Sequence, residues 1–483
     1  MTVSIIWWLF FFTALGLTIG SFLNVVVYRL PNEESLRSPL WSACPYCRAR
    51  IAWYDNIPLL SFILLGGRCR KCDGPIGTRY LVIEAVMAIL VLVLLDAFFI
   101  GQVRAGLSQS DFGLSDKLAY DWPVLLAHII LFACLFSMSV IDLEHYWVDI
   151  RFTNFAIVCG LFLHTFWTPR HSPTWIRPDE TMAVMTVFAA IGLVVTWIVV
   201  NCQPETESEA SESGEQLEPI EPKRPRASLR APSRIAGWSS IFLLVALLVS
   251  LFAVEGEYAA LRHAPRALIP LALIFLLIVS ESTIQRESDD EIVQALEDER
   301  PAARGMVLGE LGLLMPAIVM GLIGWWLVAS FPQFAGKVQA GLNARLPVPV
   351  FYNWSPFLGI STAVSGLIIG GALGWGVRIV FTLAFGKEAF GVGDIHLMAA
   401  AGCVAGWPVV LLGFFLTCGL ALLGWACTLP WKQARALPLG PWLSLAFLIV
   451  VIFYDELLGM PPLSRLLMAL DMLIYDNSQI SGG

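Results

Sequence analysis

Residues 81–100 read LVIEAVMAILVLVLLDAFFI, an apolar run that only Glu84 and Asp96 interrupt. A helix needs about 20 predominantly apolar residues to cross the hydrocarbon core of a bilayer. The apolar side chains are continuous and do not alternate with polar ones, which favours a transmembrane helix over a strand of a membrane β-barrel. This stretch therefore predicts a helical membrane protein.

The composition of the whole chain agrees with that prediction. Of its 483 residues, 57% are hydrophobic and only 14% are charged, whereas soluble domains carry about 25% charged residues. The net charge of -8 gathers in a few loops and offers no basic face. We therefore expect no nucleic-acid partner.

Further apolar runs extend the pattern along the chain. Candidate spans lie at 3–27, 81–100, 123–141, 152–168, 182–201, 237–254, 266–280, 307–330, 357–384, 395–427 and 437–454. The run 395–427 is too long for one span and is expected to break at Gly406, Trp407 and Pro408. The fold class expected is an all-α polytopic membrane protein, a bundle of roughly 10–12 transmembrane helices with a small domain outside the membrane.

Polar segments divide the chain into six expected parts. They are a first transmembrane helix (1–28), a cysteine-rich loop domain (29–80), a membrane core (81–168), a group of inserted transmembrane helices (169–356), a second part of the core (357–456) and a C-terminal tail (457–483). The first helix lacks a basic residue before its apolar run and a small-residue cleavage site, so it is expected to be retained. The insertion contains two polar loops, 202–236, expected to be disordered, and 281–306, which suits a short helix.

Basic residues indicate the orientation of the chain. The 29–80 domain carries eight of them, at Arg29, Arg37, Arg48, Arg50, Arg68, Arg70, Lys71 and Arg79. The loop 101–122 carries only Arg104 and Lys117. Because short cytoplasmic loops are enriched in Lys and Arg, we expect the 29–80 domain in the cytoplasm and the N-terminus outside.

Four cysteines stand in the 29–80 domain as two C-x-x-C pairs, Cys44/Cys47 and Cys69/Cys72. Each pair can turn two sulfurs towards one ion, and the 21 residues between the pairs let the chain return, as in tetrahedral four-cysteine zinc sites. A reducing cytoplasm disfavours disulfides. Cysteine fills all four coordination positions and leaves none for a water molecule. We therefore expect a structural zinc ion that holds the cytoplasmic domain together. Unligated thiols are the alternative.

Asp142 and Asp394 are the candidate catalytic residues. Asp142 follows the apolar run 129–141, and Asp394 follows the span 357–384 in a Gly-Val-Gly-Asp sequence. Six expected spans lie between them, and an even number returns the chain to the same membrane face. We therefore expect both carboxyl groups at the cytoplasmic face, close enough to act together.

Two neighbouring carboxyl groups suit peptide hydrolysis. Because both cannot ionise easily at short range, one can take a proton from the attacking water while the other donates to the peptide carbonyl oxygen. Gly391 and Gly393 would let the backbone approach a peptide closely. The alternative is that both aspartates merely cap or anchor helix ends. Glu144, His145 and Asp149 are expected to be solvated groups at the interface.

Five stretches together resemble the prepilin leader peptidases, GxGD-type intramembrane aspartyl proteases that also act as N-methyltransferases. They are GSFLNVVVYRLP (20–31), Cys44 and Cys47 leading into WYDNIPLLS (53–61), GRCRKC (67–72) through Arg79 and Tyr80 to Glu84, Ile141-Asp142, and EAFGVGD (388–394). The first three form an almost continuous match over residues 20–84. The stretch LPLGPW at 437–442 is a weaker match to the same family.

The resemblance implies an aspartic endopeptidase that uses Asp142 and Asp394. Its substrates would be type IV prepilins or type II secretion pseudopilins, cut at the cytoplasmic face of the bacterial inner membrane. It also implies an N-methyltransferase activity that uses S-adenosylmethionine and is associated with the 29–80 domain, although no residue can be assigned to bind that cofactor. The implied partners are a prepilin or pseudopilin and the lipid bilayer.

Three features depart from the pattern of that family. The Pro and Asp usual at seven and eight residues after the first catalytic Asp are Asp149 and Ile150 here, and the Lys usual two residues after the second is His396. The inserted spans within 170–350 have no counterpart. Two other interpretations stay open: a peptidase without methyltransferase activity, and a membrane transporter or scaffold with a zinc-bound loop. A transporter predicts two related halves, and the broken helix near 406–408 has no match elsewhere in the sequence.

Overall fold

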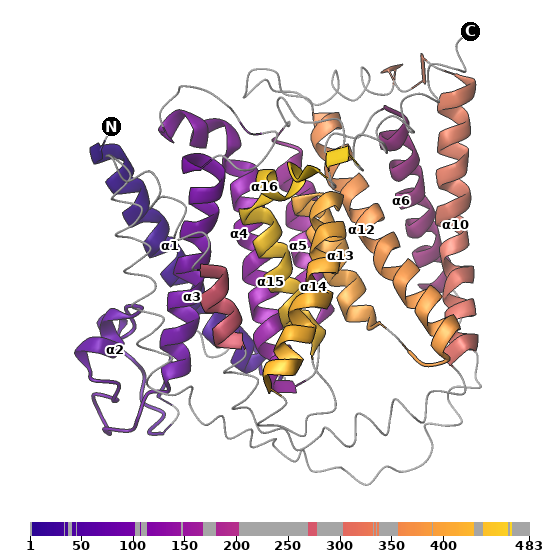
Figure 1. Cartoon of the computed structure of the whole chain (residues 1–483). Helices are drawn as coiled ribbons and strands as arrows, with labels where there is room; N and C mark the ends of the chain where they lie inside the picture. Colours follow the sequence, from indigo (N-terminus) through magenta and orange to yellow (C-terminus); the bar gives the residue numbers. More distant parts are fainter. Residues whose placement is uncertain are drawn as a thin grey trace, which may run out of the picture.

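Helices make up the regular structure of the chain in this computed structural model (Figure 1). The structure describes residues 2–32, 34–36, 41–44, 46–101, 107, 114–145, 148–167, 180–201, 269–277, 303–331, 333–334, 336–337, 356–388, 390–428, 438–461 and 464–465. Within these ranges the only β-structure is two isolated bridges in the 29–80 domain. The expected all-α fold is confirmed.

Seven helices of the described residues are long and apolar enough to cross a membrane, as expected of a multi-pass membrane protein. They are α1 (Thr2–Arg29), α3 (Thr78–Leu95), α4 (Leu114–His145), α6 (Glu180–Asn201), α10 (Ala303–Ser330), α12 (Pro356–Phe385) and α14 (Trp407–Thr428). Three shorter apolar helices are α5 (Ile150–His164), α13 (Val392–Ala405) and α15 (Leu439–Ile452). The helices α2 (Leu60–Leu64) and α16 (Tyr454–Leu458) are too short to cross.

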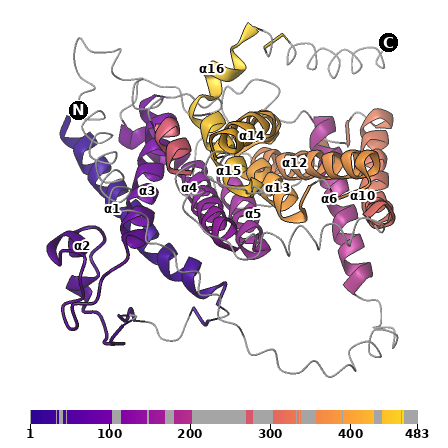
Figure 2. The same ribbon diagram turned by 60° about the horizontal axis from the view of Figure 1, so that its bottom comes forward.

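Helix α1 lies along α3 at one side of the bundle (Figures 1 and 2). A Cβ on Gly16 would lie 2.6 Å from the Cα of Ala88, and a Cβ on Gly20 would lie 2.7 Å from the Cα of Glu84. Small residues at such crossings let transmembrane helices pack backbone to backbone. These two glycines therefore let α1 pack directly against α3. In the chain, α1 precedes the cysteines of the 29–80 domain and α3 follows them.

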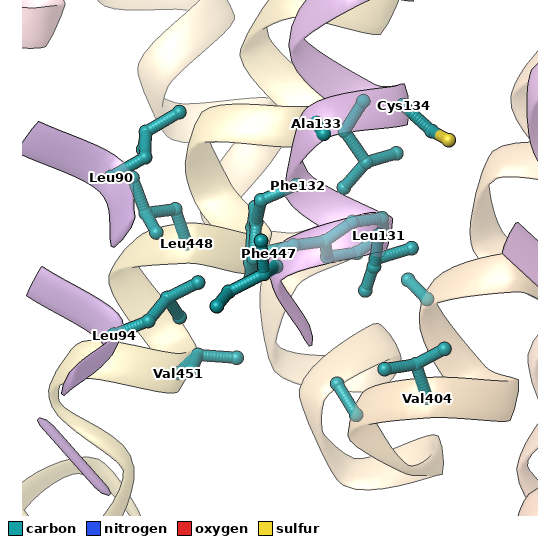
Figure 3. Packing of buried hydrophobic residues seen from close by; sticks show 14 of the residues in the cluster. Leu90, Leu94, Leu131, Phe132, Ala133, Cys134, Val404, Phe447, Leu448 and Val451 are labelled. Carbon is teal, nitrogen blue, oxygen red and sulfur yellow. The ribbon is translucent and has the colours of Figure 1, made fainter. Parts of the chain in front are cut away.

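The central core is formed by α3, α4, α13 and α15 (Figure 3). Phe132 of α4 and Phe447 of α15 lie at its centre, with Leu90 and Leu448 on one side and Val404 of α13 on the other. All of these side chains are buried. This packing holds α4 and α13, whose ends carry the two candidate aspartates, in one rigid assembly.

Glycine also brings α12 against α13 and ends α13. A Cβ on Gly366 of α12 would overlap the carbonyl oxygen of Gly402 of α13. Helix α13 ends at Ala405 and α14 starts at Trp407, with Gly406 between them at a φ of 94°. Only glycine adopts such a φ at little cost, so the predicted break of the 395–427 run is confirmed.

The helices α6 and α10, from the insertion, pair with each other on the side away from α1 (Figures 1 and 2). A Cβ on Gly192 of α6 would lie 2.6 Å from the Cα of Ala317 of α10. The pair joins the rest of the bundle at α12, where the hydroxyl groups of Thr186 and Ser365 are hydrogen-bonded at 2.9 Å. Only 22% of the α6 span and 17% of the α10 span are buried inside the molecule, as expected for helices that contact lipid.

The other predicted spans are found as helices wherever the structure describes them. Helix α4 starts at Leu114 and continues through Pro123, so part of the predicted loop 101–122 is helical instead. Proline is tolerated inside transmembrane helices, which is why it did not mark the boundary. Of the predicted span 266–280, the structure describes 269–277, which is helical. The predicted span 237–254, the loop 202–236 and most of the loop 281–306 lie outside the described residues.

Candidate active site and metal site

Asp142 lies in the last turn of α4, and Asp394 lies in the first turn of α13. Asp142 is buried, Asp394 is partly exposed, and the two carboxyl groups interact electrostatically. They come together because α4 and α13 pack against each other, although 252 positions separate the two residues in the chain. Two such carboxyl groups favour a state in which one keeps its proton.

The carboxyl pair lies at the end of the bundle that carries the 29–80 domain (Figure 1). Arg79, in the first turn of α3, directly follows that domain's second cysteine turn in the chain. Its guanidinium pairs with the carboxylate of Glu144, in the last turn of α4, at 3.2 Å. The cysteine domain and Asp142 are therefore on the same side of the helical core.

Gly391 and Gly393 allow the backbone around Asp394 to pack closely. A Cβ on Gly391 would lie 3.3 Å from Oδ2 of Asp394. A Cβ on Gly393 would lie 2.6 Å from the Cβ of Val148, in the turn that follows α4. The second glycine thus lets the chain beyond Asp142 close against the start of α13.

Gly440, in the first turn of α15, is a third such glycine, and no sequence motif predicts its contact with Asp142. A Cβ at this position would lie 2.7 Å from Oδ2 of Asp142. The start of α15 therefore forms one wall of the carboxyl pair. The only signal in the sequence was the weaker stretch 437–442, whose relation to Asp142 depends on tertiary packing.

Asp149 is not the solvated interfacial group that the sequence predicts. Its exposed fraction is 3%, and its carboxylate accepts a hydrogen bond from the backbone N–H of Arg151 at 2.9 Å. It therefore caps the N-terminus of α5, and it also pairs with the Arg151 guanidinium at 2.6 Å. The prediction was wrong because the chain reverses between α4 and α5, and the cap turns the side chain inwards. Glu144 is likewise paired, and His396 on α13 is partly exposed.

A largely apolar groove lies between α3, α4 and α15. The polar residues Arg79, Ser139, Glu144 and Ser444 also line it, whereas neither candidate aspartate does. Its apolar wall consists of Val82, Val86, Leu90, Phe132, Leu135, Phe136, Leu445 and Leu448. Residues 269–277 of the insertion line it through Leu273, Leu276 and Leu277. Leu143 and Pro441, the direct neighbours of Asp142 and Gly440, also line it.

The four cysteines of the 29–80 domain converge on one point. Their sulfur atoms all lie within 4.8 Å of one another. The Sγ atoms of Cys44 and Cys72 are 3.8 Å apart, which equals the edge of about 3.8 Å that a tetrahedron with Zn–S bonds of about 2.3 Å would have. The donor set and its spacing therefore fit a tetrahedral metal ion. No disulfide joins these residues.

The two C-x-x-C pairs are held by matching backbone turns. The N–H of Cys44 donates to the carbonyl of Ala49 at 3.0 Å, and the N–H of Cys69 donates to that of Gly74 at 2.9 Å. The fourth residue after each of these cysteines, Arg48 and Asp73, has a φ of 54°. Each turn is therefore preformed to direct its two sulfurs the same way.

Backbone hydrogen bonds also favour the thiolate form in the second turn. The N–H groups of Lys71 and Cys72 point at the sulfur of Cys69 and lower the pKa of its thiol from 9.0 to about 7. Metal ions bind thiolates and not thiols. The Cys69 sulfur is therefore prepared to act as a ligand, whereas desolvation and the neighbouring cysteine side chains raise the pKa of the Cys72 thiol to about 12.

Glu84 anchors the cysteine domain to the helical core. Its carboxylate, buried in α3, accepts a hydrogen bond from the backbone N–H of Leu59 at 2.8 Å. A second link runs from the side-chain amide of Asn24 in α1 to the carbonyl of Tyr80 at 3.2 Å. A carboxylate within an apolar span is costly unless it is paired, and that was the available signal for this role.

Comparison with known families finds a match in the N-terminal part of the chain. Residues 14–98 match the family model described as the bacterial peptidase A24 N-terminal domain. This segment contains the four clustered cysteines and Glu84 and ends before Asp142. No solved structure matches the chain.

Several curated proteins are similar over longer or shorter parts. A prepilin leader peptidase/N-methyltransferase from Myxococcus xanthus is 35% identical over 153 residues, which cover 32% of this chain and 39% of the relative. One from Vibrio cholerae is 44% identical over 84 residues, or 16% and 33% of the two chains. A type 4 prepilin-like proteins leader peptide-processing enzyme from Escherichia coli is 36% identical over 196 residues, or 36% and 62%. The predicted resemblance is confirmed, and the chain spans from 33% to 62% of the length of these relatives.

Proposed function

We propose that this chain is a bifunctional prepilin peptidase of the bacterial inner membrane. It removes the leader of a type IV prepilin or type II secretion pseudopilin and then methylates the new N-terminus. The observation that carries the proposal is the meeting of two carboxyl groups, Asp142 and Asp394, at adjoining helix ends beside an apolar groove. The names of the similar proteins supply the substrate class.

In the proposed reaction, Asp142 and Asp394 share one proton. The ionised carboxylate accepts a proton from a water molecule as its oxygen attacks the scissile carbonyl carbon. The protonated carboxyl group donates to the carbonyl oxygen, and the proton taken from water then passes to the leaving amine. Gly391 and Gly440 keep the space around the two carboxyl groups narrow, which favours one geometry of attack.

The apolar groove between α3, α4 and α15 suits the hydrophobic helix that follows a pilin leader. Its lining is mostly aliphatic and aromatic, and it includes Leu143 and Pro441, the chain neighbours of Asp142 and Gly440. The basic 29–80 domain, at the same end of the core, lies in the cytoplasm under this proposal, with the N-terminus outside. The leader would then be cut on the cytoplasmic side as it leaves the bilayer.

The methyltransferase part of the proposal rests on the names of similar proteins, which are called prepilin leader peptidase/N-methyltransferase. S-adenosylmethionine would supply an electrophilic methyl group to the free amine that cleavage creates. Cys44, Cys47, Cys69 and Cys72 would hold a structural zinc ion that keeps the two turns of the 29–80 domain together. The 29–80 domain lies at the end of the bundle where the new N-terminus is released.

The decisive experiment is a leader-cleavage assay with the full chain in membranes. The variants Asp142→Asn and Asp394→Asn should each abolish cleavage of a prepilin with a Gly-Phe junction, while membrane insertion stays normal. Asp116→Asn changes an exposed aspartate at the opposite end of α4 and should leave cleavage unchanged. Cleavage retained in either of the first two variants would contradict the role of the aspartate pair.

The mass of the new N-terminal peptide separates the two enzymatic interpretations. A methylated N-terminus after incubation with S-adenosylmethionine supports the bifunctional enzyme. Complete cleavage with an unmethylated N-terminus would support the interpretation as a peptidase without methyltransferase activity.

A further inference from the structure

Arg378 of α12 links the insertion to the segment that carries Asp394. Its side chain is buried in an apolar helix. Its Nε–H donates to both carboxylate oxygens of Glu310 of α10, at 2.9 and 3.2 Å, and Nη2 donates to one of them at 2.9 Å. Its Nη1 donates to the carboxylate of Glu388 and to the backbone carbonyl of Phe390, the latter at 2.6 Å.

These bonds end directly beside the candidate active site. Phe390 is buried, packs edge-on against Phe414 of α14, and precedes the Gly-Val-Gly-Asp segment. The next residue, Gly391, caps α13 and accepts the hydrogen bond from the N–H of Ile395 at 3.3 Å. The Phe390 carbonyl therefore sets the direction in which the first turn of α13, with Asp394, leaves the loop.

Helix α10 contacts the same connection at a second point. Gly386, which ends α12 with a φ of 67°, faces the guanidinium of Arg304, and a Cβ there would lie 3.3 Å from its Nη2. The first half of α10 thus touches the connection between α12 and α13 at its beginning, while Arg378 secures its end. A helix that only added lipid-facing surface would need neither contact.

The charge of Glu310 within a membrane span indicates that its pairing with Arg378 has a role beyond contact with lipid. A carboxylate within a membrane span is costly and is rarely kept without a partner or a function. Its side chain is only 18% exposed, and the planar guanidinium of Arg378 meets it in the two-pronged geometry that arginine forms with carboxylates. Pairing fixes the guanidinium plane and thereby aims the remaining donors at Glu388 and Phe390.

We infer that Glu310 and Arg378 are positioning residues for Asp394, so that the inserted helix α10 sets the geometry of the catalytic site. This inference rests on the proposed peptidase function. Glu310 orients the Arg378 guanidinium, the guanidinium holds the Phe390 carbonyl, and the carbonyl fixes the turn from which Asp394 projects. The inserted helix α10 then contributes to catalysis by fixing the position of Asp394.

Kinetics of prepilin cleavage by the full chain test this inference. Arg378→Gln should lower kcat on the order of 10–100-fold, because small displacements of a catalytic group cost that much, and Glu310→Gln should lower it less. KM should change little, because neither residue lines the groove. Thr186→Val is the matched control: it removes the 2.9 Å hydrogen bond between α6 and α12 without touching the Asp394 segment. Its kcat should equal that of the unchanged chain.

A second readout does not need activity. Lys387 is exposed in the α12–α13 connection, so trypsin can cut there when the connection loosens. Cutting after Lys387 in detergent-solubilised protein should be faster in Arg378→Gln and Glu310→Gln and unchanged in Thr186→Val and Asp394→Asn.

The outcomes separate the inference from the proposed function. Unchanged kcat and unchanged trypsin cutting in Glu310→Gln would overturn the inference, as would an equal loss of kcat in Thr186→Val. If the unchanged chain cleaves no prepilin, the proposed function fails, and the trypsin rates still decide whether the ion pair holds the connection. If Arg378→Gln does not accumulate in membranes, Glu310→Gln decides by itself.

Discussion

Around the two aspartates, single glycines control how closely neighbouring segments approach. Because Gly393 has no side chain, Val148 can pack against it, and for the same reason the carboxylate of Asp142 can lie against Gly440. In each case the space that a methyl group would need is already filled. The carboxyl pair is therefore sensitive to the smallest possible side-chain addition at these positions.

Gly440→Ala should displace the Asp142 carboxylate, because the new Cβ would lie 2.7 Å from its Oδ2. We expect leader cleavage to fall on the order of 100-fold while insertion and the melting temperature in detergent change little. Gly419→Ala in α14 is the control, since a Cβ at that position meets nothing within 4 Å. Normal cleavage by Gly440→Ala would show that α15 does not confine Asp142.

The candidate aspartates could be singled out in the sequence because carboxyl groups are rare beside apolar runs, and the four cysteines because their C-x-x-C spacing suits a metal site. Gly440, Asp149 and Arg378 could not be predicted as parts of the site. Asp149 caps α5 through Arg151, two residues away. Gly440 and Arg378 instead act on partners that only the folded bundle brings close, the Asp142 carboxylate for Gly440 and the Phe390 carbonyl for Arg378. Such roles depend on tertiary packing, which local patterns do not contain.

At the scale of elements, the cysteine domain contains two similar turns whose sulfur atoms converge on one point. Each turn is closed by its own backbone hydrogen bonds, and the sulfurs of the two turns meet at close range. A bound metal ion would therefore supply the main link between the turns. Its loss should loosen the domain without disturbing the helical core.

Zinc binding by this domain should weaken as the pH falls. The pKa of the Cys69 thiol is lowered from 9.0 to about 7, so the thiolate contributes to the folded domain fully above pH 9.0 and is lost as the pH falls through about 7. Protons compete with the metal for the same sulfur. Zinc retained by the purified chain after dialysis should decrease progressively below about pH 7.

Serine substitutions provide the control for that measurement. Cys44→Ser should lose zinc throughout the pH range, whereas Cys418→Ser, in α14 and outside the cluster, should behave like the unchanged chain. Equal zinc content in all three proteins would contradict the metal site.

Element boundaries were predictable where a residue forces the backbone to change. Gly406 ends α13 because its φ of 94° suits glycine. The span predicted to start at 123 starts at Leu114 instead, because proline is tolerated inside membrane helices where neighbouring helices support the backbone. The pattern of apolar residues shows where a helix is buried in lipid or protein, and it says less about how far the helix extends beyond that layer.

The whole molecule places the cysteine domain, the carboxyl pair and the α12–α13 connection at one end of the bundle (Figure 1). The Arg79–Glu144 pair joins the first two, and Asp394 belongs to the third. Prediction from sequence reached this arrangement by counting spans. It could not reach the contact of the insertion with the site, because Glu310 and Arg378 are separated by 68 positions and pair only in the folded bundle.

Labelling with a membrane-impermeant maleimide should show the orientation of the chain. A cysteine introduced by Lys387→Cys should react only after the inner membrane is permeabilised, because this end is cytoplasmic under our proposal. A cysteine introduced by Asp116→Cys, exposed at the opposite end of α4, should react in intact spheroplasts. The parent chain measures the background from native cysteines. The reverse labelling pattern would place the site on the outer face.

The three short helices beside the carboxyl pair have a consequence for the surrounding lipid. Helices α5, α13 and α15 contain 15, 14 and 14 residues, so at about 1.5 Å per residue they are roughly 21–23 Å long. The hydrocarbon layer is about 30 Å thick. Of the three, α5 exposes Phe155, Val158 and Phe162, so acyl chains next to it must compress to match its length, which shortens the distance that water travels to the aspartates. Cleavage in vesicles should therefore slow as the acyl chains lengthen, and a rate independent of bilayer thickness would contradict this hydrophobic mismatch.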